Sequence, residues 1–108
     1  MRFSSFFISV IVCAGIGSTS LSADVVKGQK WYTKECKSCH GNGTKGAAMH
    51  TQDEWNDLFA NEGSDIIKKH VGTPAEAYFK GENFKNRSKD IRDFLFEYGS
   101  DSGNVPAC

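Results

Sequence analysis

Apolar residues recur with helical periodicity most clearly near the C-terminal end of the chain. Four of them follow the i, i+3, i+4, i+7 spacing that places side chains on one face of an α-helix: Ile91, Phe94, Leu95 and Tyr98. Ser88 lies before this run as a candidate helix cap, and Gly99 lies after it as a stop signal. The pattern predicts a last helix between Ser88 and Gly99 with one buried face.

A first helix is predicted over residues 24–35, because Asp24 can cap it and several good helix formers follow. Gly28, Tyr32 and Cys36 follow one another at four-residue spacing. Residues at that spacing share one side of a helix. A small gap, an aromatic ring and a thiol are therefore expected to lie in a single stripe.

Shorter helices are predicted in the middle of the chain. Thr51 and Glu54 form a capping-box signature, and Gly63 is expected to end the helix that begins there. Ile66 and Ile67 indicate a further short helix that ends by Gly72. Residues 41–46 are predicted to form a turn-rich loop, and residues 75–87 a helix fragment with a loop. Because strand patterns are scarce, the fold class expected is all-α.

The most specific chemistry lies in the segment Cys36-Lys37-Ser38-Cys39-His40. Two thiols that flank a dipeptide can reach the two vinyl groups of a haem and form thioethers. The adjoining His40 then serves as the proximal ligand of the iron. The sequence therefore predicts one covalent haem c, attached at Cys36 and Cys39.

Two other interpretations of the paired cysteines are weaker. A thioredoxin-like redox pair needs a βαβ context, which a chain with few strand patterns does not offer. A structural zinc site needs a second pair of ligands at matching spacing, and only His50, His70 and Cys108 remain to provide it among the residues that follow the motif.

The first 23 residues have the layout of a secretory signal peptide, with Arg2, a short apolar run and a small-residue end at Ala23. Cleavage there would deliver the rest of the chain to the periplasm, with no membrane span. Residues 24–99 are then one small domain, whose thin core a haem would supplement. Residues 100–108 are predicted to be a flexible tail ending in Cys108, which is unpaired once the haem is attached.

With these features in place, the chain resembles the small class I cytochromes c of bacterial periplasms, which carry one haem. The resemblance covers residues 24–99. It rests on the haem-attachment motif and on one pair of residues in each terminal helix: Gly28 and Tyr32 in the first, Leu95 and Tyr98 in the last. It implies a haem-centred core in which the N- and C-terminal helices cross, with Gly28 and Tyr32 against Leu95 and Tyr98. It also implies that a backbone carbonyl within residues 46–48 orients His40.

The second axial ligand of the iron departs from the family pattern. The family supplies a methionine shortly before its last helix, but residues 72–87 contain neither Met nor His. His70 is the leading candidate, because it comes late enough in the chain to reach the distal face. Met49 is the runner-up, although its loop belongs to the proximal side in the family. His50 is a weaker candidate for the same reason.

These features predict a periplasmic electron carrier that is not itself an enzyme. Residues 68–92 contain seven basic and three acidic side chains. This excess fits either the steering of redox partners with acidic surfaces or solubilising charges on helix surfaces. Residues 24–108 carry 12 basic and 13 acidic side chains, since Arg2 is the only charged residue before Asp24. This balance argues against nucleic acid as a partner.

Two other functions stay open. One is an electron-accepting subunit of a periplasmic dehydrogenase, for example a molybdenum enzyme that oxidises sulfite. The other is an enzyme or gas sensor with an open haem site.

Overall fold

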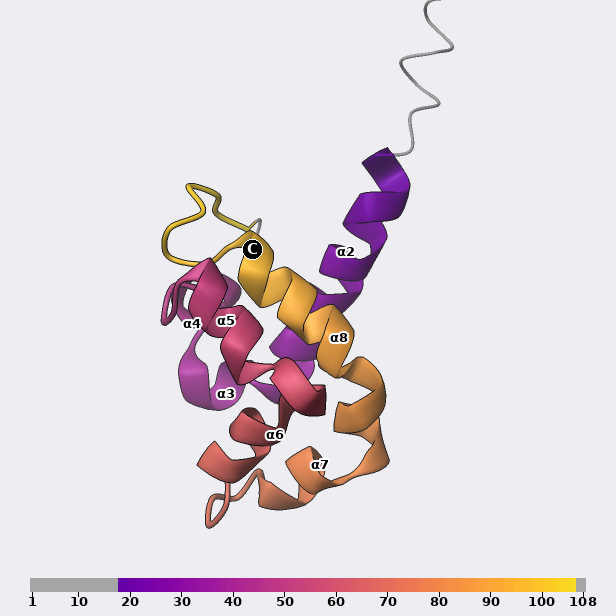
Figure 1. Ribbon diagram of the computed structural model, residues 1–108, viewed down its shortest axis with the longest axis vertical. Coiled ribbons are helices and arrows are strands. Elements are labelled where there is room, and N and C mark those ends of the chain that lie inside the picture. Colours follow the sequence, from indigo (N-terminus) through magenta and orange to yellow (C-terminus); the bar gives the residue numbers. More distant parts are fainter. Residues whose placement is uncertain (1–17, 107–108) are drawn as a thin grey trace, which may run out of the picture.

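The computed structural model describes residues 18–106, with side chains from residue 25 onward (Figure 1). Most of the predicted signal peptide, and Cys108 with it, lie outside the described residues. Seven helices and no strand are found in the described part of the chain, which confirms the all-α class: α2 (Ser18–Glu35), α3 (Lys37–His40), α4 (Gly43–Ala47), α5 (Gln52–Leu58), α6 (Ala60–Lys69), α7 (Glu76–Lys80) and α8 (Glu82–Glu97). The first of them begins before Asp24, the cap that the sequence analysis expected.

The first and last helices, α2 and α8, cross as expected (Figure 1). The crossing point is Gly28, where a Cβ would overlap the backbone carbonyl of Asp90 and the Cβ of Phe94. One turn further along α2, the ring centroids of Tyr32 and Phe94 lie 5.6 Å apart. The resemblance implied that Gly28 and Tyr32 lie against Leu95 and Tyr98. The residues of α8 nearest to Gly28 are instead Asp90 and Phe94, because residues at four-residue spacing on α2 pack against the row Asp90–Phe94 on α8.

The last helix begins earlier than its sequence pattern indicated. Gly81 precedes its first residue, Glu82, and Ser88 is not a cap but lies buried within the helix, with its hydroxyl 3.4 Å from the carbonyl oxygen of Lys85. The reason is Phe84, which is 1% exposed. It extends the buried face of α8 by two turns toward the N-terminus, over part of the segment predicted as a loop.

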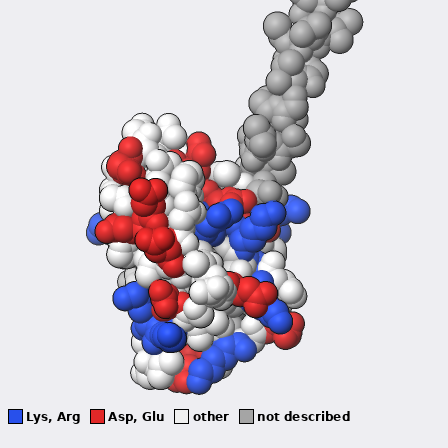
Figure 2. Space-filling model, viewed as in Figure 1, with Lys and Arg blue, Asp and Glu red and all other residues white. Residues whose placement is uncertain are grey.

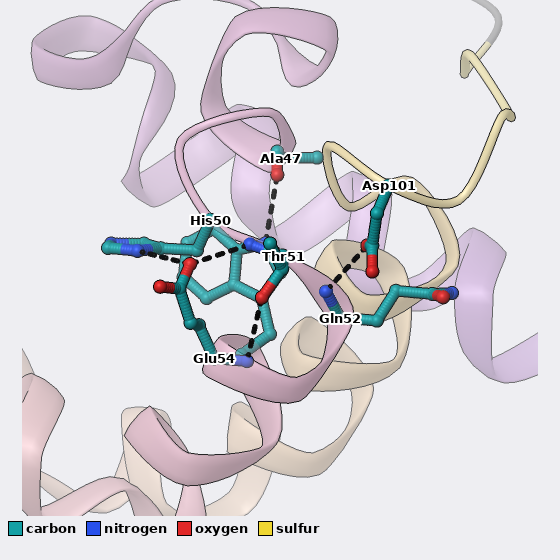
Figure 3. A network of polar contacts seen from close by, with 7 residues as sticks. Ala47, His50, Thr51, Gln52, Glu54 and Asp101 are labelled. Carbon is teal, nitrogen blue, oxygen red and sulfur yellow. Dashed lines mark hydrogen bonds and ion pairs between the residues drawn. The ribbon is translucent and has the colours of Figure 1, made fainter.

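The start of α5 confirms the predicted capping box (Figure 3). The Thr51 hydroxyl accepts a hydrogen bond from the Glu54 amide at 3.2 Å, and the Glu54 carboxylate accepts one from the Thr51 amide at 2.8 Å. The helix does not continue to Gly63 as predicted, but ends at Leu58.

A left-handed turn separates the first residue of α6 from its main part. Asn61, Glu62 and Gly63 have φ angles of 55°, 57° and 79°, values that residues other than glycine rarely adopt. Gly63 faces the ring of Phe84, and a Cβ at this position would lie only 2.9 Å from the nearest ring atoms. The turn therefore lets the chain pass close to the buried face of α8.

Residues 41–46, predicted as a loop, are partly helical. The side chain of Asn42 accepts a hydrogen bond of 3.0 Å from the Lys45 amide and so caps α4. Gly46 lies against the hydroxyl of Tyr32, where any Cβ would overlap that oxygen. The short helix α4 thus packs closely against the tyrosine of α2.

The segment after α8 returns to the start of α5. The Ser100 amide donates to the carbonyl of His50 at 2.9 Å. The Gln52 amide donates to the Asp101 carboxylate at 2.9 Å (Figure 3). Flexibility of residues 100–108 stays a prediction, but the first of them are tied to the domain. No helix in the described residues is both long and apolar enough to cross a membrane.

Candidate functional site

A cavity of about 380 Å³ lies within the domain, a volume in the range of small-molecule and cofactor sites. Most of its wall is apolar and comes from residues of α2, α5, α6, α7 and α8: Tyr32, Trp55, Leu58, Ile66, Phe79 and Leu95. The two cysteines and the histidine of the attachment motif line the same cavity, as does His70. The structure therefore brings together the residues that the sequence analysis selected separately.

The attachment motif spans the junction of α2 and α3. The Cys36 amide donates to the Tyr32 carbonyl at 2.8 Å, so the motif begins as a continuation of α2. Cys39 and His40 then belong to the single turn of α3. Both cysteines are free thiols that line the cavity, and their three-residue separation on a helical turn places them on one side.

The environment of Cys36 differs from that of a reactive redox thiol. Burial raises its pKa to about 12, with smaller contributions from the negative charges of Glu35 and Cys39. Thioredoxin-type cysteines have a lowered pKa, which keeps the attacking thiolate available. Cys36 therefore lacks the electrostatic setting of the attacking cysteine in a thiol–disulfide exchange site.

His70 is held at the end of α6 by two contacts. Its Nδ1 lies 2.7 Å from the carbonyl oxygen of Ile66, one of the last carbonyls of the helix. Its ring stacks on Phe79, with centroids 4.0 Å apart and planes 24° from parallel. Because Nδ1 is occupied by the carbonyl, Nε2 is the nitrogen left to bind a metal.

The rings of His40 and His70 lie close together in the wall of the cavity. Their centroids are 6.0 Å apart and their planes are nearly perpendicular, at 83°. A histidine nitrogen binds a first-row metal at about 2.0–2.1 Å, and the ring centre lies roughly 1 Å behind that nitrogen. Two imidazoles on opposite sides of one ion would thus have centres about 6 Å apart, so the spacing fits a shared iron.

The expected carbonyl contact to His40 is not seen in the described residues. The Gly46 carbonyl accepts from the Met49 amide at 3.2 Å, and the Ala47 carbonyl accepts from the Trp55 indole at 2.8 Å (Figure 3). The proximal loop is therefore fastened to α5 through Trp55 instead of to the His40 ring.

Met49 and His50 also line the cavity, from the connection between α4 and α5. Met49 is 46% exposed. The His50 ring packs edge-on against Trp55 at 4.8 Å, and its Nδ1 lies 3.5 Å from the Glu54 carboxylate (Figure 3). The His50 side chain is thus engaged at the start of α5, whereas His70 has a ring contact with His40.

The basic stretch Lys68–Arg92 is partly neutralised by its neighbours. Lys80 pairs with Glu76 at 2.6 Å, Arg87 with Glu35 at 3.3 Å, and Arg92 with Asp93 at 2.7 Å. Four other lysines of the stretch are exposed: Lys68, Lys69, Lys85 and Lys89. Figure 2 shows basic side chains interspersed with acidic ones over the lower part of this face, where α6 and α7 lie, and a group of acidic side chains near α5 and the C-terminal segment.

Two side chains near the site were not found by sequence reasoning. Phe79 stacks on His70, but it lies in a segment of mixed composition where no periodic pattern pointed to that partner. Arg87 lies with its guanidinium 3.8 Å from the ring centre of Trp31, next to Glu35. Each contact joins residues of two different helical segments, so spacing within one helix gave no signal for it.

Comparison with protein families gives a match to the cytochrome c family over residues 25–95, about two thirds of the chain. The chain belongs to the cytochrome c family. It is therefore a haem-binding protein of electron transfer, and the family implies a covalently bound c-type haem. Comparison with curated proteins gave no match, and comparison with solved structures gave none either.

Proposed function

We propose that this protein is a periplasmic electron carrier with a single haem c, held by thioethers to Cys36 and Cys39 and by His40 and His70 as axial ligands. One observation supports it above the others: two imidazole rings with centroids 6.0 Å apart line an apolar cavity whose wall also contains both cysteines. An iron with two protein ligands has no open position for a substrate, which suits a carrier better than an enzyme or gas sensor.

The haem, when bound, supplies the exchange of one electron between ferric and ferrous iron. His40 and His70 would hold the iron, and the Ile66 carbonyl orients the His70 ring through Nδ1. The aromatic side chains that line the cavity would keep water from the metal. The thioether sulfur of a methionine ligand favours ferrous iron, whereas an imidazole does not. A His40/His70 pair would therefore give the haem a lower reduction potential than a His/Met pair.

The partner in this proposal is a redox protein with an acidic surface. The exposed lysines of the basic stretch, of which Lys69 also lines the cavity, would meet that surface close to the haem. Contacts of this kind are small and short-lived in electron transfer, and their association rate falls as ionic strength rises. The periplasmic location rests on the signal-peptide pattern of residues 1–23.

Two experiments on protein exported with the haem-attachment machinery test this proposal. Covalent haem at Cys36 and Cys39 should leave the protein coloured after acid–acetone extraction, and replacing both cysteines by serine should release the pigment. Loss of colour from the wild-type protein would contradict the attachment. The reduced spectrum should also be insensitive to carbon monoxide, and a rapid change on adding the gas would indicate an open site instead of a carrier.

A further inference from the structure

We propose that Phe79 is a positioning residue that fixes the ring plane of His70 nearly perpendicular to that of His40. The inference rests on the proposed function, since it takes His70 as an axial ligand of the haem iron. It assigns to Phe79 a part in setting the electronic state of the iron, beyond its place in the core.

Phe79 restrains rotation of the His70 ring. The two rings are stacked at 4.0 Å with planes 24° from parallel. A stacked neighbour at this distance is in van der Waals contact over most of one ring face, so rotation of the imidazole about its bond to Cβ would drive it into the phenyl ring.

Phe79 is itself immobilised by its neighbours. It is 6% exposed, and its ring centroid lies 4.8 Å from that of Phe84 and 5.1 Å from that of Tyr78. Both contacts are edge-to-face, an arrangement that aromatic pairs favour. Phe79 therefore acts as a fixed wall that belongs to the packing of α7 against α8.

A hydrogen bond holds the His70 ring at a second point. The Ile66 carbonyl lies 2.7 Å from Nδ1 of His70. A hydrogen bond at one edge and a stacked ring on one face together leave the imidazole a single orientation. In that orientation its plane is 83° from the plane of His40.

The angle between the two imidazole planes affects the electronic state of the ferric iron. In a low-spin ferric haem with two planar axial ligands, the angle between the ligand planes sets the splitting of the iron d orbitals. Nearly perpendicular planes give a highly anisotropic electron paramagnetic resonance (EPR) signal with a large maximum g value, and nearly parallel planes give a rhombic signal. The structure therefore assigns the anisotropic signal to this protein.

The test is the EPR spectrum of ferric holoprotein for the wild type, Phe79→Leu, Phe79→Tyr and Phe94→Leu. Phe94 is a matched control, because it is a fully buried phenylalanine of the core whose ring packs on Tyr32 and Tyr98 and not on Phe79 or His70. We expect the anisotropic signal in the wild type and in Phe94→Leu. Phe79→Leu should convert it wholly or partly to a rhombic signal, and Phe79→Tyr, which retains a ring, should preserve it.

Three results would overturn the inference: a rhombic wild-type signal, an unchanged signal in Phe79→Leu, or equal changes in Phe79→Leu and Phe94→Leu. The variant His70→Ala separates this failure from failure of the proposed function. If its spectrum differs from the wild type while that of Phe79→Leu does not, His70 is the ligand and only the role of Phe79 is wrong. If it matches the wild type, both proposals fail.

Discussion

The carbonyl oxygen of Asp90 occupies the space that a side chain at Gly28 would fill. A glycine at the middle of a helix costs about 0.8–1.0 kcal/mol relative to alanine, so its presence here needs a reason, and the crossing of α2 and α8 provides one. The backbone of Asp90 cannot move aside as a flexible side chain would, because it belongs to the hydrogen-bonded interior of α8.

Gly28→Ala should therefore destabilise the protein although alanine is the better helix former. Overpacking of a filled interface costs roughly 1–3 kcal/mol, which outweighs the gain in helix propensity. The measurement is the free energy of unfolding of the holoprotein in urea. Lys27→Ala is the matched control on the exposed side of α2 and should change that energy by less than about 0.5 kcal/mol. An equal effect of the two substitutions would contradict the close crossing.

Tyr32 should make stability fall at alkaline pH. Burial, followed by the nearby Cys36, raises its pKa from 10.0 to about 12, and its hydroxyl donates a hydrogen bond of 2.7 Å to the Gly41 carbonyl. Below about pH 10 the phenol is neutral in both states and pH has no effect through it. Between 10 and about 12 the unfolded chain loses the proton while the folded chain keeps it, so unfolding becomes progressively easier.

Ionisation of Tyr32 should lower the free energy of unfolding by about 2 kcal/mol when the pH reaches about 12. It is measured as the pH dependence of the free energy of unfolding, with tyrosinate absorbance as a second readout. Tyr32→Phe should be less stable by about 1 kcal/mol at neutral pH for lack of the hydrogen bond, and should show a shallower alkaline decline. A decline of the same steepness in this variant would exclude Tyr32 as the source.

The left-handed turn before the main part of α6 offers a stabilising substitution. Glu62 is exposed and has a φ of 57°, a conformation that costs residues with a Cβ roughly 1–2 kcal/mol. Glu62→Gly should therefore raise the melting temperature, with a net gain of about 1 kcal/mol once the greater freedom of glycine in the unfolded chain is subtracted.

Two neighbouring positions serve as controls for this turn. Asn61→Gly should gain less, because asparagine tolerates the left-handed region better than glutamate does. Gly63→Ala should lower the melting temperature, since it combines a φ of 79° with a Cβ 2.9 Å from the Phe84 ring. A loss of stability in Glu62→Gly would show that the turn is not left-handed in solution.

Local signals in the sequence predicted the helical class, the capping box of Thr51 and Glu54, and the gathering of the cysteines with His40 in one motif. Each of these depends on residues within a few positions of one another. The position of the last helix was misjudged because Ser88 has the character of a cap, and only the burial of Phe84 shows that the helix passes through it.

Contacts between distant elements were beyond reach of the sequence. Which row of α8 side chains meets Gly28 depends on the rotation of the two helices about their axes. The apolar periodicity of α8 is the same whether Leu95 or Phe94 lies at the crossing, so the sequence pattern does not distinguish the two. The stack of His70 on Phe79 likewise depends on how α6 and α7 fold back on each other. Sequence reasoning could nominate His70 from its place in the chain, but not the carbonyl and the ring that orient it.

The most direct test of the account is the visible spectrum of the holoprotein at neutral pH in the variants His70→Ala and Met49→Leu. His70→Ala should lose the low-spin, six-coordinate spectrum and should bind carbon monoxide when reduced, because the iron then lacks its second protein ligand. Met49→Leu should leave both properties as in the wild type. The reverse result, with Met49→Leu altered and His70→Ala unchanged, would assign the distal position to Met49 and contradict the His40/His70 pair.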